Sequence, residues 1–173
     1  MTPEFSRIER LDTIGADTRS VTVTADEHER AALAKRFGLI SIESLVGAFT
    51  LRREAAGVIV NGRVDATLVQ ACSVTGDPLD ASVAEPVALL FVEPGKGEEA
   101  EVELGADTID TVELEGGGVD LGETAAETMA LALDPFPRSP GAEAALRAAG
   151  VIGEDEAGPF GALAGLKAKL KGE

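Results

Sequence analysis

The 173-residue sequence contains one cysteine, one histidine, and neither tyrosine nor tryptophan. A single cysteine cannot form a disulfide within the chain, and Cys72 and His28 together cannot complete a four-ligand zinc site. Proteins that bind single-stranded nucleic acid stack bases on clustered aromatic side chains. The six phenylalanines here are scattered, and we expect them to belong to the core. The composition therefore predicts no metal, no cofactor and no base-stacking surface.

The sequence also lacks a long apolar run. No stretch of about 18 apolar residues, the length that spans a bilayer as a helix, is present. The first ten residues, MTPEFSRIER, include acidic side chains and no apolar stretch of the kind found in secretory signals. We therefore expect a cytoplasmic protein with no membrane contact.

Positive charge is scarce and unevenly placed. The net charge is −16, with nine Lys and Arg against ten Asp and Glu in residues 1–70, but six against twenty-one in residues 71–173. Such a chain repels phosphate backbones. We therefore expect no DNA binding, and any RNA contact must come from a local basic patch.

The densest acidic stretch, residues 93–127, contains twelve acidic residues and one lysine. One interpretation is that it binds a basic protein; the other is that the charge only keeps the protein soluble. The candidate partner-binding residues in this stretch are Glu98, Glu99, Glu101 and Glu103.

Alternating apolar residues predict several strands. Two short ones cover residues 5–11 and 21–24, and another covers 49–53 before a hairpin loop at 54–57. Residues 58–74 keep their apolar set at even positions, which favours one continuous strand, bulged at Gly62, over a hairpin at Asn61-Gly62. Residues 83–92 are apolar at both parities, so we expect this strand to be covered on both faces. Residues 39–46 fit either a short helix or a connector.

Helix signals are clearest at two places. Asp26 and Glu29 have the spacing of a capping box, and Gly38 is placed to end the helix that they begin. Asp120 and Glu123 have the same spacing before an apolar helix, which the prolines of residues 134–140 terminate. Two further helices are expected, over residues 142–149 and 159–170.

These elements predict an α+β fold: a curved, mainly antiparallel sheet with packed helices and a helical C-terminal tail. Whether the sheet closes into a barrel stays open. We expect a core domain over residues 1–140 and a less tightly folded tail over residues 141–173.

Potential catalytic and phosphate-binding features have simpler structural interpretations. By parity Cys72 faces the apolar side of its strand, so we interpret it as a buried structural residue and expect no catalytic residue and no enzymatic activity. Glycines 116–118 precede a helix but lack the lysine of a phosphate-binding loop. The following segment is a helix cap or a recognition surface for a partner, with candidate residues Asp120, Leu121, Gly122 and Glu123.

Two groups of basic residues are candidates for RNA contact. Arg52, Arg53 and Arg63 lie on strands expected to be neighbours. The second group lies near the end of the chain and consists of Lys167, Lys169 and Lys171. The alternatives are ordinary surface ion pairing for the arginines and a helix C-terminus complemented by lysines.

Three segments together resemble the YceD family, the large ribosomal RNA subunit accumulation proteins. They are VIVNGRVDATLVQACSVTGDP, VDLGETAAETMALALDPFPR and the closing FGALAGLK. Many members of that family carry a Cys-x-x-Cys pair where this chain has Cys72 and Thr75, so a metal site built on that pair has no basis here. The resemblance marks Asp-Leu-Gly-Glu at residues 120–123 as the family's most recognisable segment.

The resemblance implies a non-enzymatic role in large ribosomal subunit assembly, supporting accumulation of the 23S rRNA. The partner would be a precursor of the large subunit, through 23S rRNA, a basic ribosomal protein, or both. The alternative from composition alone is a general acidic adaptor or protein chaperone unrelated to ribosomes.

Overall fold

The computed structural model describes residues 3–94, 109–114 and 117–151. The chain divides into two compact units. The larger unit comprises Met1–Gln70 and Asp80–Pro135, and the smaller unit comprises Ala71–Leu79 and Phe136–Glu173. The expected tail over residues 141–173 lies mostly outside the described residues, so that division stays a prediction.

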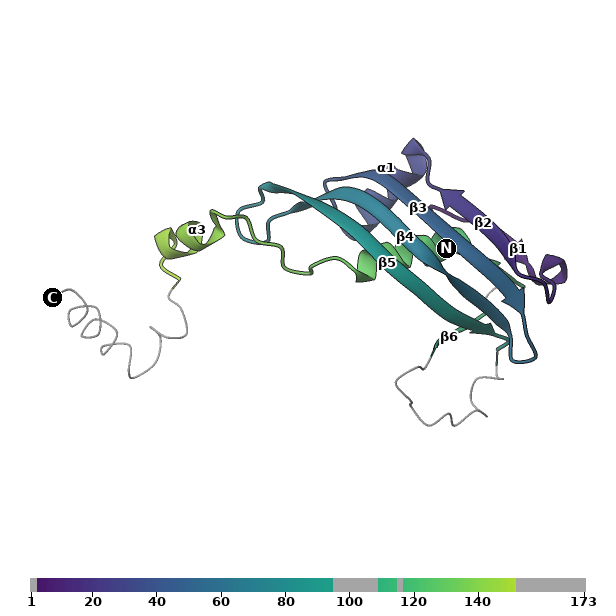
Figure 1. Ribbon diagram of the computed structural model, residues 1–173. Coiled ribbons are helices and arrows are strands. Elements are labelled where there is room, and N and C mark those ends of the chain that lie inside the picture. Colours follow the sequence, from purple (N-terminus) through teal and green to yellow (C-terminus); the bar gives the residue numbers. More distant parts are fainter. Residues whose placement is uncertain (1–2, 95–108, 115–116, 152–173) are drawn as a thin grey trace, which may run out of the picture. The chain divides into compact units, whose positions relative to one another are not determined.

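The described elements follow one another as two short strands, a helix, three long strands, two further short strands and two further helices (Figure 1). The strands are β1 (Ile8–Arg10), β2 (Arg19–Thr24), β3 (Ser41–Arg53), β4 (Val58–Ala71), β5 (Pro78–Val92), β6 (Asp110–Glu113) and β7 (Gly118–Asp120). The helices are α1 (Glu27–Phe37), α2 (Leu121–Leu131) and α3 (Ala142–Ala148), with a 3-10 turn at Leu11–Thr13. None of the described helices is long and apolar enough to cross a membrane.

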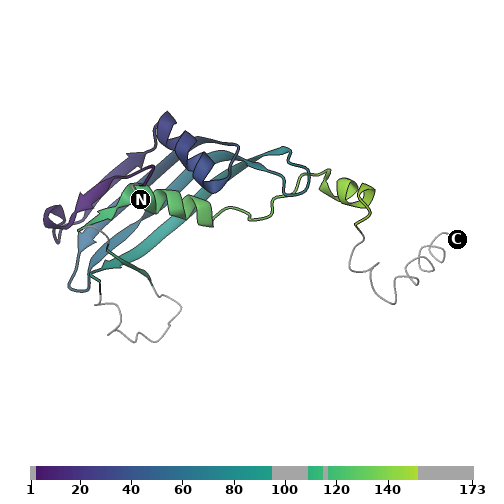
Figure 2. The same cartoon turned by 180° about the vertical axis from the view of Figure 1, so that it is seen from behind.

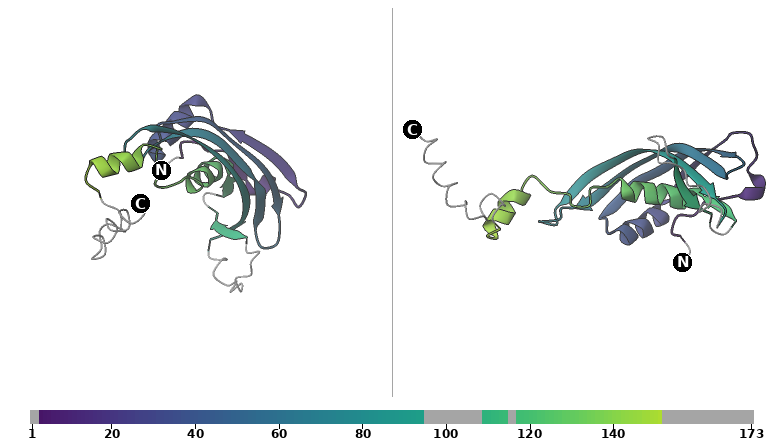
Figure 3. Two further views of the ribbon diagram at one scale, coloured as in Figure 1. Left: turned by 60° about the vertical axis from the view of Figure 1, so that its left-hand side comes forward. Right: turned by 90° about the horizontal axis from the view of Figure 1, so that it is seen from below.

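The strands form a five-stranded sheet in the order β2-β3-β4-β5-β6 and a separate pair, β1-β7. The pairs β2/β3, β3/β4 and β1/β7 are antiparallel, whereas β5/β6 is parallel. Helices α1 and α2 lie on one face of the sheet (Figures 2 and 3) and pack against β3. The fold is therefore α+β with a mixed, mainly antiparallel sheet. Within the described residues β2 and β6 are open edges, so these strands do not form the closed barrel considered from the sequence.

Strand β3 is longer than the sequence predicted, because it includes most of the ambiguous residues 39–46. A register shift between Ile42 and Ser44 inserts one extra residue, so that Ile42 and Leu45, at opposite parities, are both buried. The broken alternation is what disguised the strand. The bulge expected at Gly62 is absent: Gly62 pairs in register with Phe49. Glycine is needed there because a Cβ would lie 2.2 Å from the carbonyl oxygen of Ala48.

Strand β4 is continuous, as its parity predicted, with Val58, Val60 and Val64 buried on one face. Strand β5 was expected to be covered on both faces, and this is wrong for most of its length. Val83 and Val87 are buried, but the residues between and beside them are exposed up to Ala88. The helices cover only one face of the sheet, so the alanine, serine and proline side chains on the other face remain in solvent.

The core lies between the sheet and the two helices. Phe5, Phe49 and Phe91 are buried there, as expected for the phenylalanines. Phe136 is 72% exposed, so its assignment to the core was wrong. Phe160 lies outside the described residues.

Candidate functional site

Helix α2 begins at a tightly bonded N-cap. The Asp120 carboxylate accepts hydrogen bonds from the backbone N–H groups of Gly122 (3.0 Å) and Glu123 (3.2 Å). It also accepts from the N–H of Arg7 (2.7 Å) and the hydroxyl of Ser6 (2.5 Å). Asp120 thus satisfies free donors at the helix start and fixes the N-terminal segment to it at the same time.

Glu123 does not complete the expected capping box. Its side chain instead forms a two-pronged ion pair with Arg36 of α1, at 2.6 and 3.0 Å. Arg36 also donates to Glu4 at 3.0 Å, and the hydrogen bonds that it donates to Glu123 raise the pKa of Arg36 above its ordinary value. The spacing from Asp120 predicted that the Glu123 carboxylate would bond the helix cap. It pairs instead with Arg36, which is distant in the sequence.

A second ion pair joins the N-terminal segment to α1. Arg7 bonds both carboxylate oxygens of Glu29, at 2.7 and 3.0 Å, and this contact raises the pKa of Arg7. Glu29 also completes the capping box of α1 with Asp26, as the sequence predicted. The N-terminal segment is therefore fastened to the first turns of both α1 and α2 by charge-assisted hydrogen bonds.

The burial of residues 120–123 bears on their proposed recognition role. Leu121 is fully buried, and Gly122 packs so tightly that an added Cβ would lie 2.4 Å from the carbonyl oxygen of Phe5. Neither residue can offer a side chain to a partner in this structure. The carboxylates of Asp120 and Glu123 are engaged in contacts within the chain, and their role in recognition stays a prediction.

The three candidate arginines do not form one patch. Arg52 and Arg63 occupy strand positions whose side chains point to the sheet face away from the helices. Arg52 forms an ion pair with Glu54 and Arg63 with Asp65, each two residues further along the chain. Arg53 lies at the parity of buried Leu51, on the other face. Its guanidinium donates to the carbonyl oxygen of Leu11 at 3.0 Å. The described arginines are therefore already engaged in contacts within the protein.

The remaining charged candidates lie outside the described residues. They are Glu98, Glu99, Glu101 and Glu103 in the acidic stretch, and Lys167, Lys169 and Lys171 near the end of the chain. Their roles stay predictions from the sequence.

In the smaller unit, Cys72 is 3% exposed, which confirms the expected burial. Its sulfur accepts hydrogen bonds from the backbone N–H groups of Ser139 (3.2 Å) and Thr75 (3.5 Å). The Thr75 hydroxyl lies 2.6 Å from an Asp77 carboxylate oxygen and 3.3 Å from the Ser139 hydroxyl. Hydrogen bonds thus close the turn that follows Cys72.

Sequence reasoning missed the electrostatic consequence of this turn. Hydrogen bonding from Ser139, and then from Thr75, lowers the pKa of the Cys72 thiol from its ordinary 9.0 to about 6. The donors are hydroxyl and backbone N–H groups from two segments. A low thiol pKa is usually expected beside a basic residue, and no basic residue is needed here. These donors favour the anionic form of the sulfur.

We expect the thiolate absorbance of Cys72 to rise through a midpoint near pH 6, and to be absent in Cys72→Ser. Because the folded-state pKa lies below the unfolded value of 9.0, this group stabilises the native state fully above pH 9. That contribution shrinks as pH falls and is lost below about pH 6. Denaturation of the wild type and Cys72→Ser across this range measures the difference. A midpoint near pH 9 would show that the hydrogen bonds do not favour the thiolate.

Comparison with known proteins gives one finding. A family model described as Large ribosomal RNA subunit accumulation protein YceD matches residues 60–167. The matched segment begins in β4 and includes both the Cys72 turn and the α2 cap. No curated protein and no solved structure matches significantly.

Proposed function

Because the chain belongs to the YceD family, named for accumulation of the large ribosomal subunit RNA, we propose that it is a non-enzymatic, cytoplasmic factor in biogenesis of the large ribosomal subunit. Its effect on 23S rRNA would come from protecting or positioning an assembly component. The observation that carries this proposal is the family match over more than half of the 173 residues.

We propose that the direct partner is a basic ribosomal protein. The net charge of −16 favours a cationic partner and opposes phosphate. Arg52 and Arg63, the arginines on the helix-free face, are paired with Glu54 and Asp65, so a phosphate would have to compete with these carboxylates. Cys72, at 3% exposure, is not placed to attack a substrate.

Sedimentation tests the assembly role. We expect tagged protein to follow large-subunit precursors through a low-salt gradient, and cells lacking it to accumulate less 23S rRNA. A general acidic adaptor would instead spread across the gradient without following these precursors, and 23S rRNA would stay at its normal level. That result would reject the ribosomal role.

The acidic stretch gives a separate prediction about the partner. Changing Glu98, Glu99, Glu101 and Glu103 to glutamine should slow association with a basic protein. Binding by the wild type should weaken steeply with salt, because screening shortens the range of charge interactions to about 8 Å at physiological ionic strength. Association rates at several salt concentrations provide the measurement.

The control for the acidic-stretch variant is a second variant in which Arg52, Arg53 and Arg63 are changed to glutamine. If the partner is rRNA phosphate, this variant should lose binding and the acidic-stretch variant should not. Wild-type association by the acidic-stretch variant would show that those charges serve solubility only.

A further inference from the structure

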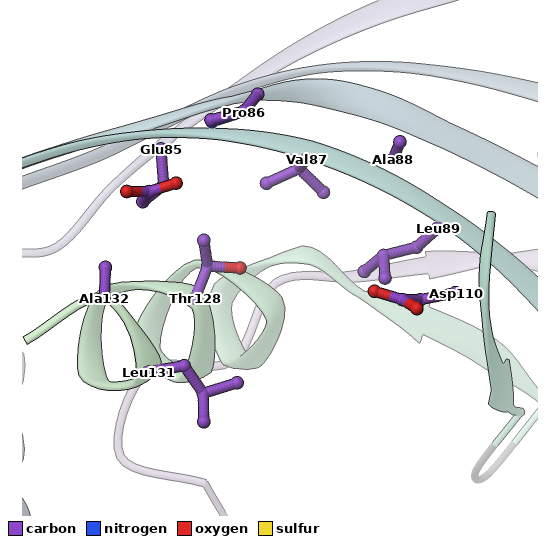
Figure 4. A pocket seen from close by; sticks show the side chains of 9 residues that line it. All are labelled: Glu85, Pro86, Val87, Ala88, Leu89, Asp110, Thr128, Leu131 and Ala132. Carbon is purple, nitrogen blue, oxygen red and sulfur yellow. The ribbon is translucent and has the colours of Figure 1, made fainter. Parts of the chain in front are cut away.

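A groove lies between strand β5 and the last turns of α2 in the larger unit (Figure 4). It encloses about 350 Å³. Its strand side carries Val87 and Leu89, and its helix side carries Thr128 and Leu131. The groove forms because α2 packs against β3, β2 and β1, which leaves the neighbouring face of β5 only partly covered.

The groove has an apolar anchor point. Leu131 is 87% exposed at the end of α2, where it forms the rim of the groove and points away from β5 in Figure 4. On the strand side Val87 is buried in the core, and Leu89 is only partly buried. A large exposed leucine beside an apolar strand face is the kind of surface that an apolar side chain of a partner can bury.

The charged groups of the groove are all acidic. Glu85 has the same parity in β5 as the buried Val83 and Val87, so its carboxylate points toward α2, as Figure 4 shows. Asp110 contributes a second carboxylate from β6. The described structure gives neither of them an ion pair, and no lysine or arginine lines the groove.

Strand β6 pairs with β5 over Leu89–Val92, and the part of β5 before Leu89 does not favour addition of a partner strand on that side. Val92 accepts a hydrogen bond from Leu114 on the β6 side, so even-numbered residues direct their backbone groups to that edge. Pro86 is one of these residues and has no N–H to donate, which interrupts any added ladder. A partner is therefore expected to bind through side chains in the groove.

We propose that this groove binds a segment of a basic protein that carries an apolar side chain flanked by lysine or arginine. The apolar side chain packs against the partly buried Leu89 and against Leu131 at the rim of the groove, and the cationic groups pair with Glu85 and Asp110. Two carboxylates repel phosphate, so nucleic acid is the wrong class of ligand. The inference rests on the proposed function, which supplies the class of partner as a basic protein of the large ribosomal subunit.

Charge and shape variants test the groove. We expect Glu85→Lys with Asp110→Lys, and separately Leu131→Gln, to weaken association with the basic partner by about tenfold or more, as loss of a central contact does. The control Asp80→Lys with Asp17→Lys makes the same change in net charge at exposed sites. Asp80 lies in the same strand at the opposite parity, and Asp17 lies in a loop. The control should bind as the wild type apart from a small change in association rate.

A photo-crosslinking amino acid identifies the ligand class. Placed at Leu131, it should crosslink in cells to a basic large-subunit protein; placed at exposed Ala48, on the helix-free face, it should not. Crosslinks from position 131 to RNA, or equal binding by groove and control variants, would overturn the groove inference while co-sedimentation keeps the ribosomal role. Crosslinks to a basic protein from outside the ribosome would support the groove and reject that role.

Discussion

Gly122→Ala is expected to lower the free energy of unfolding of the larger unit by about 3–5 kcal/mol, in the range of severe packing defects. The added Cβ would lie 2.4 Å from the carbonyl oxygen and 2.9 Å from the carbonyl carbon of Phe5, and 3.0 Å from the backbone nitrogen of Arg7. These are backbone atoms, so no side-chain rotation relieves the overlap. Chemical denaturation measures the loss.

The N-terminal segment cannot simply move aside in this variant. The N–H of Leu121 donates to the carbonyl oxygen of Arg7 at 3.0 Å, and Asp120 holds Arg7 and Ser6. Relief of the overlap would therefore break these bonds, and hydrogen exchange should report loss of protection in β1 and β7.

Gly15→Ala is the control, because its Cβ would meet nothing closer than 3.9 Å. We expect a change within about 0.5 kcal/mol, as for ordinary surface substitutions. Equal stability of the two variants would show that the segment around Phe5 is not packed against Gly122 as described.

Features with short-range causes could be predicted from the sequence. The capping box of α1 depends on Asp26 and Glu29, three residues apart, and its left-handed end depends on Gly38 alone; all are present. The continuity of β4 followed from the parity of its own residues. In each case the deciding contacts lie within the element, so no partner elsewhere in the chain had to be known.

The incorrect expectations have long-range causes. Glu123 leaves its local cap position for Arg36, 87 residues away, and no spacing rule reveals that competitor. The exposed face of β5 depends on where α1 and α2 pack, which the apolar content of residues 83–92 could not show. The pKa of Cys72 likewise depends on Ser139, 67 residues away.

The contacts of residues 120–123 are also long-range, and the recognition surface expected there stays a prediction. Asp-Leu-Gly-Glu stands out as a motif, but its contacts reach Ser6, Arg7 and Arg36 within the chain. A recurrent motif can therefore mark a joint between distant segments as readily as a binding surface. The groove beside Leu131 has no local motif and emerges only from the packing of α2.

Asp120→Ala is expected to destabilise the larger unit by about 3 kcal/mol. Loss of an N-cap accounts for about 1 kcal/mol, and the N–H of Arg7 losing its acceptor accounts for about 1–3 kcal/mol. Asp120→Asn keeps one acceptor oxygen for the three N–H groups that Oδ1 serves. The Ser6 hydroxyl can turn to accept from the new amide, so we expect a loss of only about 1 kcal/mol. Denaturation and gradient sedimentation of both variants separate the two interpretations. If Asp120 only holds the segments together, association with large-subunit precursors should follow stability, and the Asp120→Asn variant should bind almost as well as the wild type. If a fully stable Asp120→Asn variant loses association, the Asp120 carboxylate is a recognition group.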